Sequence, residues 1–127
     1  MGLDLERTLN DRGVTIMLRN TTRNTLRHRA LEEAWPVDPK AADEDTRTYF
    51  GFIAAFCERA EGLESLPLKS GASGKQIEQA YQRFLDETDE SLVLACMDAL
   101  GDLRAPSANA VEKPEAALTK EEATDPN

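Results

Sequence analysis

The feature that most constrains how this chain folds is a segment near its middle in which apolar residues recur every three or four positions. The series is Tyr49, Phe52, Ile53, Phe56, Ala60 and Leu63, widened by Phe50, Ala54 and Cys57. This spacing places the side chains along one face of an α-helix. Acidic residues at positions 43–45 begin the segment, where they complement the positive end of the helix dipole. We therefore predict a central helix from about Asp43 to about Ala60.

A second apolar series predicts a helix before the central one, from about Thr22 to Ala34. Its predicted apolar stripe is Leu26, Ala30, Leu31 and Ala34. Asn20 or Thr21 has a suitable side chain for the N-terminal cap. Pro36 ends the helix, because proline disfavours the helical conformation in the residue before it.

Two further helices are predicted after a link over residues 62–74 that contains proline, serine and several glycines. The first runs from about Lys75 to Glu87, and its apolar face is Ile77, Ala80, Tyr81, Phe84 and Leu85. The second follows a cap at Thr88 or Asp89. Its stripe is Leu92, Ala95, Cys96, Ala99, Leu100 and Leu103. Four such helices are enough to share one core.

The first 19 residues are predicted to form a turn and an extended arm. Residues 3–9 are compatible with one or two helical turns, with Leu5 and Leu9 four positions apart. The cluster 10–13 favours a turn. Residues 14–19 alternate apolar and other side chains, which is typical of a strand. No partner strand is evident, so this segment pairs with unidentified residues, pairs with another copy, or folds into the following helix.

The last 23 residues are rich in Ala, Glu, Pro, Lys and Thr and contain little that a core would bury. We predict a disordered acidic tail over 105–127, because burial would not offset the entropy lost on ordering. The predicted fold is therefore mainly α. It is a small bundle of about four helices over 20–104, with a short N-terminal extended segment and a disordered C-terminal tail.

The formal net charge is −9, and it is distributed unevenly. Residues 1–31 carry six arginines against three acids, whereas residues 32–127 carry nine basic residues against 21 acids. Phosphate recognition needs clustered cations. The balance therefore argues against nucleic acid or a membrane as a partner for most of the surface, and favours a protein partner. We expect a cytoplasmic protein, since no segment has the apolar length of a membrane span.

Catalytic, metal-binding and cofactor-binding sites are not predicted. Cys57 and Cys96 lie in apolar helical patterns and are interpreted as core residues. The one histidine, His28, lies between two arginines without an evident partner and is expected at the surface. The segment 70–75 has Gly, Ser and Lys but not the spacing of a phosphate-binding loop. We therefore expect a protein that is not an enzyme.

The arginines at 19, 23 and 27 are the most unusual candidate for partner binding, because they are spaced by four in a stretch without acids. One interpretation is a recognition surface for an acidic helix or nucleic acid. The other, which we favour, is that Arg19, Arg23 and Arg27 face the chain's own acids. Those acids would be Asp43, Glu44, Asp45, Asp98 and Asp102.

Aromatic residues supply the other candidates. Trp35, at a helix end, either closes the core or anchors a partner, and core closure is favoured because tryptophan is buried on average. Tyr49 and Phe50 are candidate apolar anchors if the wide stripe of the central helix is only partly used by the core. An apolar patch that stays exposed after folding would support a docking role.

The order of elements resembles that of small phage tail assembly chaperones. The resemblance rests on an extended N-terminal segment, an Arg-rich helix that ends in Trp35-Pro36-Val37, an aromatic helix, a Pro- and Gly-containing connector, two further helices and a charged tail. It covers roughly Gly13 to Arg104 and is architectural, so it assigns no binding residue.

The resemblance implies a protein that binds the tape measure protein, keeps its long apolar helices soluble and helps tail polymerisation begin. Some members of that family are also made in a frameshift-extended form, and a homo-oligomer is possible. The alternative function is a small regulatory protein that binds nucleic acid or polymerase through Arg19, Arg23, Arg27 and Arg29.

Overall fold

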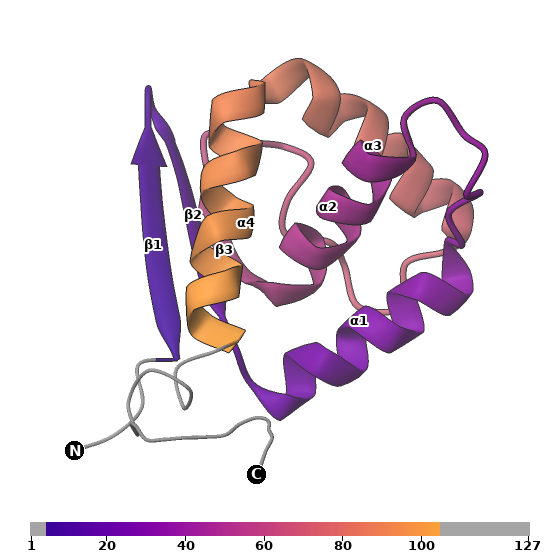
Figure 1. The fold of residues 1–127 in the computed structure, drawn as a ribbon, viewed down its shortest axis with the longest axis horizontal. Helices are drawn as coiled ribbons and strands as arrows, with labels where there is room; N and C mark the ends of the chain where they lie inside the picture. Colours follow the sequence, from indigo (N-terminus) through magenta and orange to yellow (C-terminus); the bar gives the residue numbers. More distant parts are fainter. Residues whose placement is uncertain (1–4, 105–127) are drawn as a thin grey trace, which may run out of the picture.

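The computed structural model describes residues 5–104, which form four helices and a three-stranded antiparallel sheet (Figure 1). The elements are β1 (Glu6–Asp11), β2 (Val14–Arg19), α1 (Thr22–Ala34), α2 (Glu44–Phe56), β3 (Cys57–Glu61), α3 (Gly74–Glu87) and α4 (Glu90–Arg104). The sheet order is β1-β2-β3, and α4 packs against β1 and β2. The mainly helical fold is confirmed, whereas a sheet was not expected. The predicted disordered tail lies outside the described residues.

Residues 6–19 form a β-hairpin, so the prediction of helical turns is wrong for residues 5–9, the part of that segment that the structure describes. β1 pairs with β2 from Glu6↔Arg19 to Asp11↔Val14. The two turn residues, Arg12 and Gly13, both have positive φ angles, of 49° and 86°. Tight hairpin turns of this kind match the natural twist of the two strands. Leu5 and Leu9 misled the prediction, because residues four apart share a face in a strand as well as in a helix.

The predicted strand over 14–19 is confirmed, and its second partner comes from the predicted central helix. That helix ends at Phe56, and the next residues form β3, paired with β2 from Thr15↔Glu61 to Leu18↔Cys57. The backbone becomes extended at Cys57, with φ −79° and ψ 116°. Pairing with β3 satisfies the second edge of β2, which a longer helix would have left open. The prediction of a helix to Ala60 is therefore wrong by about one turn.

The predicted positions of α1, α3 and α4 agree with the structure, and two of the predicted caps, Thr21 and Asp89, are confirmed. The Thr21 hydroxyl accepts a hydrogen bond from the Asn24 amide at 3.2 Å, and Asp89 accepts one from the Leu92 amide at 2.9 Å. Ser73 and Gln76 form a reciprocal capping box at the start of α3. The apolar stripe predicted for α1 is mostly wrong. Leu31 is buried, but Leu26 is 55% exposed.

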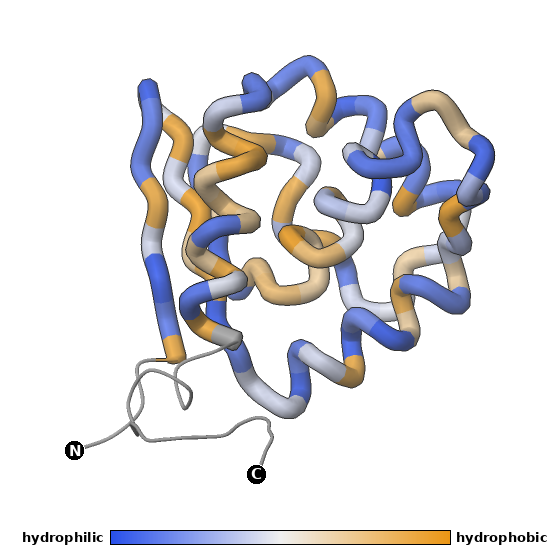
Figure 2. The backbone as a smooth tube through the Cα atoms, viewed as in Figure 1, coloured by the Kyte–Doolittle hydropathy of each residue, from blue (hydrophilic) through white to orange (hydrophobic). Residues whose placement is uncertain are grey.

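The core lies between the sheet and the helices, and hydrophobic stretches of α2 and α4 lie towards the middle of the molecule (Figure 2). The core is built around aromatic rings. Phe50 contacts Trp35, Tyr81 and Phe84 with ring centroids 5.7, 5.5 and 5.0 Å apart. Ile16 from β2 completes it from the sheet side and is fully buried. Large aromatic side chains contribute most of the apolar area in a core of this size. None of the helices in residues 5–104 is both long enough and apolar enough to cross a bilayer.

Candidate functional site

The residues predicted to bind a partner do not form one surface. Phe50 is fully buried and Trp35 is 6% exposed, so both belong to the core. Core closure by Trp35 is the interpretation that the sequence favoured. Tyr49 is half-buried at the edge of the core, and Arg19 lies at the end of β2. The structure thus separates Tyr49 from Phe50, although they are neighbours in the sequence.

Tyr49 lines an apolar groove, here called the leucine groove, formed by α2, the end of α3 and the start of α4. Its volume is about 230 Å³. Leu85 and Leu94 border it and are 40% and 45% exposed, although both are large apolar side chains. Asp89 and Glu90 also border it, which gives the groove an acidic edge. The leucine groove is therefore suited to an apolar side chain flanked by basic residues.

The sequence contained part of the signal for this groove. Leu94 falls outside the apolar stripe predicted for the last helix, and a leucine outside the stripe of an amphipathic helix is expected to reach solvent. Leu85, by contrast, was assigned to the buried face of its helix. Its exposure follows from the way α3 and α4 meet, which the sequence pattern does not specify.

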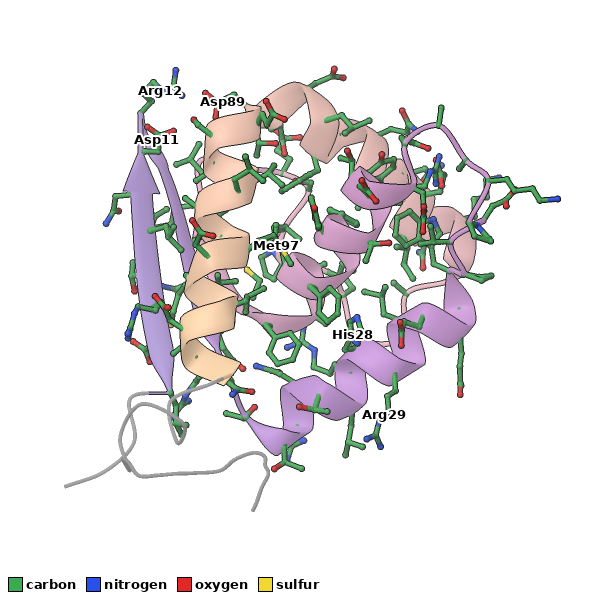
Figure 3. The ribbon with its side chains drawn as sticks, in the orientation of Figure 1. Asp11, Arg12, His28, Arg29, Asp89 and Met97 are labelled. Atoms are coloured by element: carbon green, nitrogen blue, oxygen red, sulfur yellow. The ribbon has the colours of Figure 1, made fainter. Side chains whose placement is uncertain are left out.

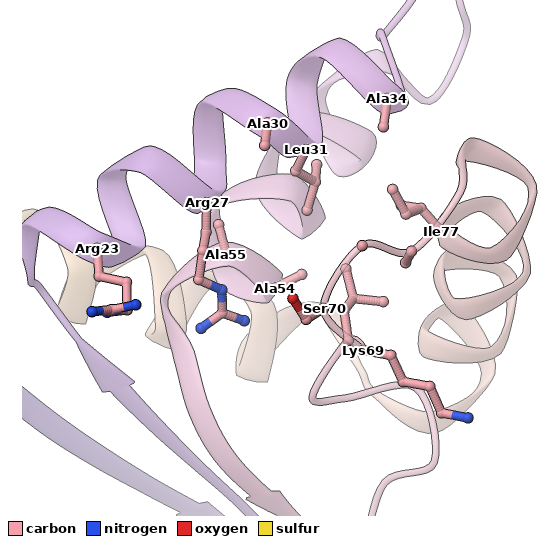
Figure 4. A pocket seen from close by; sticks show the side chains of 13 residues that line it. Arg23, Arg27, Ala30, Leu31, Ala34, Ala54, Ala55, Lys69, Ser70 and Ile77 are labelled. Atoms are coloured by element: carbon pink, nitrogen blue, oxygen red, sulfur yellow. The ribbon is translucent and has the colours of Figure 1, made fainter.

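Arg23 and Arg27 line a second hollow, here called the basic cavity, between α1, the end of α2 and the link before α3 (Figure 4). Its volume is about 430 Å³, and Lys69 and Ser70 lie on the link side. The remaining walls are apolar and mostly small. They include Ala30, Ala34, Ala54, Ala55, Ala72 and Ile77. The cavity combines cations with an apolar lining, which is the chemistry of a site for an acidic group with an apolar neighbour.

The expectation that these arginines face the chain's own acids is wrong for the described residues. Within 5–104, no carboxylate lies at ion-pair distance from Arg19, Arg23 or Arg27. Arg27 donates instead to the side-chain oxygen of Asn24 at 3.0 Å. Asn24 is fully buried, and its amide nitrogen donates to Glu58 at 2.7 Å. The Asn24 amide therefore positions Arg27, and it is the one hydrogen-bond acceptor of the Arg27 guanidinium within residues 5–104.

One of the acids proposed as a partner for these arginines, Asp43, is used elsewhere. Asp43 binds Arg47, whose Nε lies 2.9 Å from a carboxylate oxygen. Arg47 also makes two parallel hydrogen bonds to Glu78, at 2.6 and 3.1 Å. Its guanidinium lies over the rings of Trp35 and Tyr81, 5.6 and 4.6 Å from their centroids. This group, here called the arginine clasp, joins α1, α2 and α3.

Each nitrogen of the Arg47 guanidinium donates to a carboxylate, and the other two donors of the arginine clasp also have acceptors. Trp35 Nε1 donates to Glu78 at 2.9 Å, and the Tyr81 hydroxyl donates to Asp43 at 2.7 Å. Hydrogen bonds from Arg47 hold the pKa of Glu78 well below its usual value of 4.5, at about 2. Burial is the main reason that the pKa of Tyr81 is raised. Shifted pKa values often mark active sites, but they also arise in structural ion-pair networks. Saturated partners favour a structural role here.

The clasp predicts a pH dependence of stability that can be assigned to one residue. The pKa of Glu78 is lower in the folded chain, so its contribution is complete above its usual pKa of 4.5 and is lost as the pH falls towards 2. Its side chain is 38% exposed, and solvent screening limits the contribution to roughly 1 kcal/mol. We expect Glu78→Gln to remove that part of the pH dependence, measured by urea unfolding between pH 5 and pH 2 as about 1 kcal/mol.

The control is Glu64→Gln. The Glu64 side chain is 77% exposed in its pair with Arg83, so this variant should retain the wild-type profile. An identical profile in all three proteins would contradict the assignment.

His28 is not at the surface as predicted. Its side chain is 13% exposed and stacks on Phe52 with ring centroids 4.1 Å apart. In Figure 3 it is directed towards the body of the molecule, whereas Arg29 points away from it. Phe52 is itself half-buried, and the imidazole stacks on one face of its ring. His28 therefore extends the core.

The two cysteines are fully buried, as the sequence predicted, although Cys57 lies in β3 rather than in a helix. Burial raises their pKa values, to about 11 for Cys57 and about 12 for Cys96. Thiols in this condition are protonated at neutral pH and are poor nucleophiles. Within residues 5–104, no group of three or more His, Cys, Asp or Glu side chains is placed to hold a metal ion.

Comparison with known proteins gives no relative. No family model matches the sequence, and no match was found among curated proteins or among solved structures.

Proposed function

We propose that this chain is a non-enzymatic phage tail assembly chaperone, which binds the tape measure protein and keeps it soluble in the host cytoplasm during tail assembly. The observation that carries the proposal is the leucine groove. Leu85 and Leu94 stay 40% and 45% exposed on neighbouring helices. Most large apolar side chains of the described chain are buried or packed against the core. An exposed pair beside a groove is the feature that a client helix requires.

The geometry of the groove supports a helical client. An amphipathic helix binds by placing side chains three or four residues apart into an apolar groove. Tyr49 and Val93 line the groove together with the two leucines. Asp89 on its edge is already paired with Arg12, but Glu90 has no ion-pair partner within residues 5–104 and favours a basic residue beside the client's apolar stripe. The net charge of −9 keeps such a complex soluble.

The proposal expects a neighbouring gene to encode a tape measure protein, and the test is co-expression of this chain with the protein that such a gene encodes. We expect the wild-type chain to keep that protein in the soluble fraction, and Leu85→Glu/Leu94→Glu to weaken the complex at least tenfold, which corresponds to about 1.4 kcal/mol. Glutamate forms helices well, so both helices should persist. Leu26→Glu is the matched control, because Leu26 is 55% exposed on α1 and does not line the groove. Failure of the wild-type chain to solubilise the tape measure protein, or equal losses in both variants, would contradict the proposal.

The alternative, a regulatory protein that binds nucleic acid or polymerase, draws support from Arg19 and Arg23. Both are exposed, and neither has an ion-pair partner within residues 5–104. Binding to DNA at low salt, lost in Arg19→Gln/Arg23→Gln, would favour this function. Absence of binding at low salt would remove it.

A further inference from the structure

The basic cavity is a cationic site in an acidic protein. The described residues that line it include Arg23, Arg27 and Lys69 and no carboxylate. The chain as a whole has 24 acidic residues against 15 basic ones. Cations gathered around an apolar hollow attract a carboxylate-bearing segment, and the charge has not been neutralised within residues 5–104.

The end of α4 lies beside the start of the helix that carries these arginines. The side chain of Asn20 donates a hydrogen bond to the carbonyl oxygen of Leu103 at 2.9 Å. Asn20 comes just before α1, and Arg23 and Arg27 follow it by three and seven residues. At the rise of an α-helix this is about 5 and 10 Å along the axis. The chain beyond Arg104 therefore starts next to the basic cavity.

The segment that follows has suitable length and chemistry. Residues 105–127 contain five acids and two lysines. Glu112 is eight residues beyond Arg104, a distance of up to about 26 Å in an extended chain, so it can reach both arginines. Val111 precedes Glu112, and the small apolar run 116–118 follows Glu115. These small apolar side chains are suited to pack against the alanine-rich walls of the cavity. A segment that has too few apolar residues to fold by itself becomes ordered when another surface supplies the apolar contacts.

We propose that the acidic segment 105–127 of the same chain folds back along α1, pairs its carboxylates with Arg23 and Arg27, and places small apolar side chains in the basic cavity. The occupant is this chain's own segment because it starts beside the site, which gives it a high effective concentration. This contact makes Arg23, Arg27 and the basic cavity inaccessible to other acidic polymers. It does not involve the leucine groove, so its failure leaves the proposed chaperone function untouched.

Zero-length carbodiimide cross-linking of the full chain tests the proposal, because Lys69 lines the cavity and can form an amide with a nearby carboxylate. We expect mass spectrometry to find cross-links from Glu112 or Glu115 to Lys69 more often than cross-links from these glutamates to Lys40. Lys40 is exposed and lies beyond the far end of α1. High salt, about 1 M, should suppress the product by screening the ion pairs. Mixing labelled and unlabelled chains shows whether the link forms within one copy.

The matched variants are Arg23→Glu and Arg29→Glu, which change the net charge equally. Both side chains are exposed on α1, but Arg23 lines the cavity, whereas Arg29 points away from the molecule (Figure 3). We expect Arg23→Glu to reduce the Lys69 product about fivefold, because an attraction is replaced by a repulsion of similar size, and Arg29→Glu to leave it unchanged. Thermal unfolding of each variant verifies the fold. No preference for Lys69 over Lys40, equal effects of both variants, or links only between copies would overturn the proposal.

Discussion

Phe50→Ala is expected to lower the free energy of unfolding by about 3–5 kcal/mol, because the deletion of a buried ring leaves a cavity that the surrounding side chains fill only in part. Phe50 is fully buried, and its ring contacts those of Trp35, Tyr81 and Phe84. These partners come from the end of α1 and from α3. The substitution therefore weakens the contact between three helices at once. Urea unfolding followed by circular dichroism measures the loss.

Tyr49→Ala is the control for this prediction, because it removes an aromatic ring from the preceding position of α2. Tyr49 is only half-buried and lines the leucine groove. We expect it to cost roughly 1 kcal/mol of stability, as is common for substitutions outside the core, and to weaken binding of the tape measure protein. Equal destabilisation by the two substitutions would show that Tyr49 is part of the core and would weaken the assignment of the groove.

Gly62→Ala is expected to destabilise the chain by about 3 kcal/mol, through backbone strain and steric overlap together. Gly62 follows β3 and has a φ angle of 82°. A Cβ atom added there would lie 2.2 Å from the carbonyl oxygen of Gly13, in the turn of the hairpin. The three nearest atoms, from Gly13 and Val14, all belong to the backbone, so none of them can rotate away. The substitution forces the hairpin away from β3.

Gly71→Ala separates the two causes, since Gly71 has a similar φ angle of 73° and no heavy atom within 4 Å of an added Cβ. It should cost about 1 kcal/mol, the strain of a positive φ angle alone. Thermal unfolding of both variants measures the difference. If both variants lose the same free energy of unfolding, the close approach of Gly62 to Gly13 does not contribute to the cost of the substitution.

Sequence patterns predicted the structure well where the interactions join residues that are close together in the sequence. The capping side chains of Thr21 and Asp89 and the apolar faces of α3 and α4 act within about one turn, so the sequence states them directly. The same reasoning failed for residues 57–61. Their apolar spacing continues that of α2, but these residues form a strand because their backbone pairs with the open edge of β2.

The residues of the candidate sites were likewise predicted only in part from the sequence. The sequence identified Tyr49, Arg23 and Arg27 as unusual, and the structure places them at the leucine groove and at the basic cavity. It did not distinguish Tyr49 from Phe50, because both lie on the wide apolar stripe of one helix. The packing of α3 against α2 decided which ring is buried.

The sequence by itself determined the approximate positions of the four helices, two of their caps and the charge asymmetry between the first 31 residues and the rest, because each depends on residue type and short spacing. Only the tertiary structure decided that β1, β2 and β3 form a sheet, that Asp43 binds Arg47 rather than the arginines of α1, and that Leu85 and Leu94 border one groove. These features join residues far apart in the chain. Their free energies depend on which surfaces meet, and a local pattern does not contain that information.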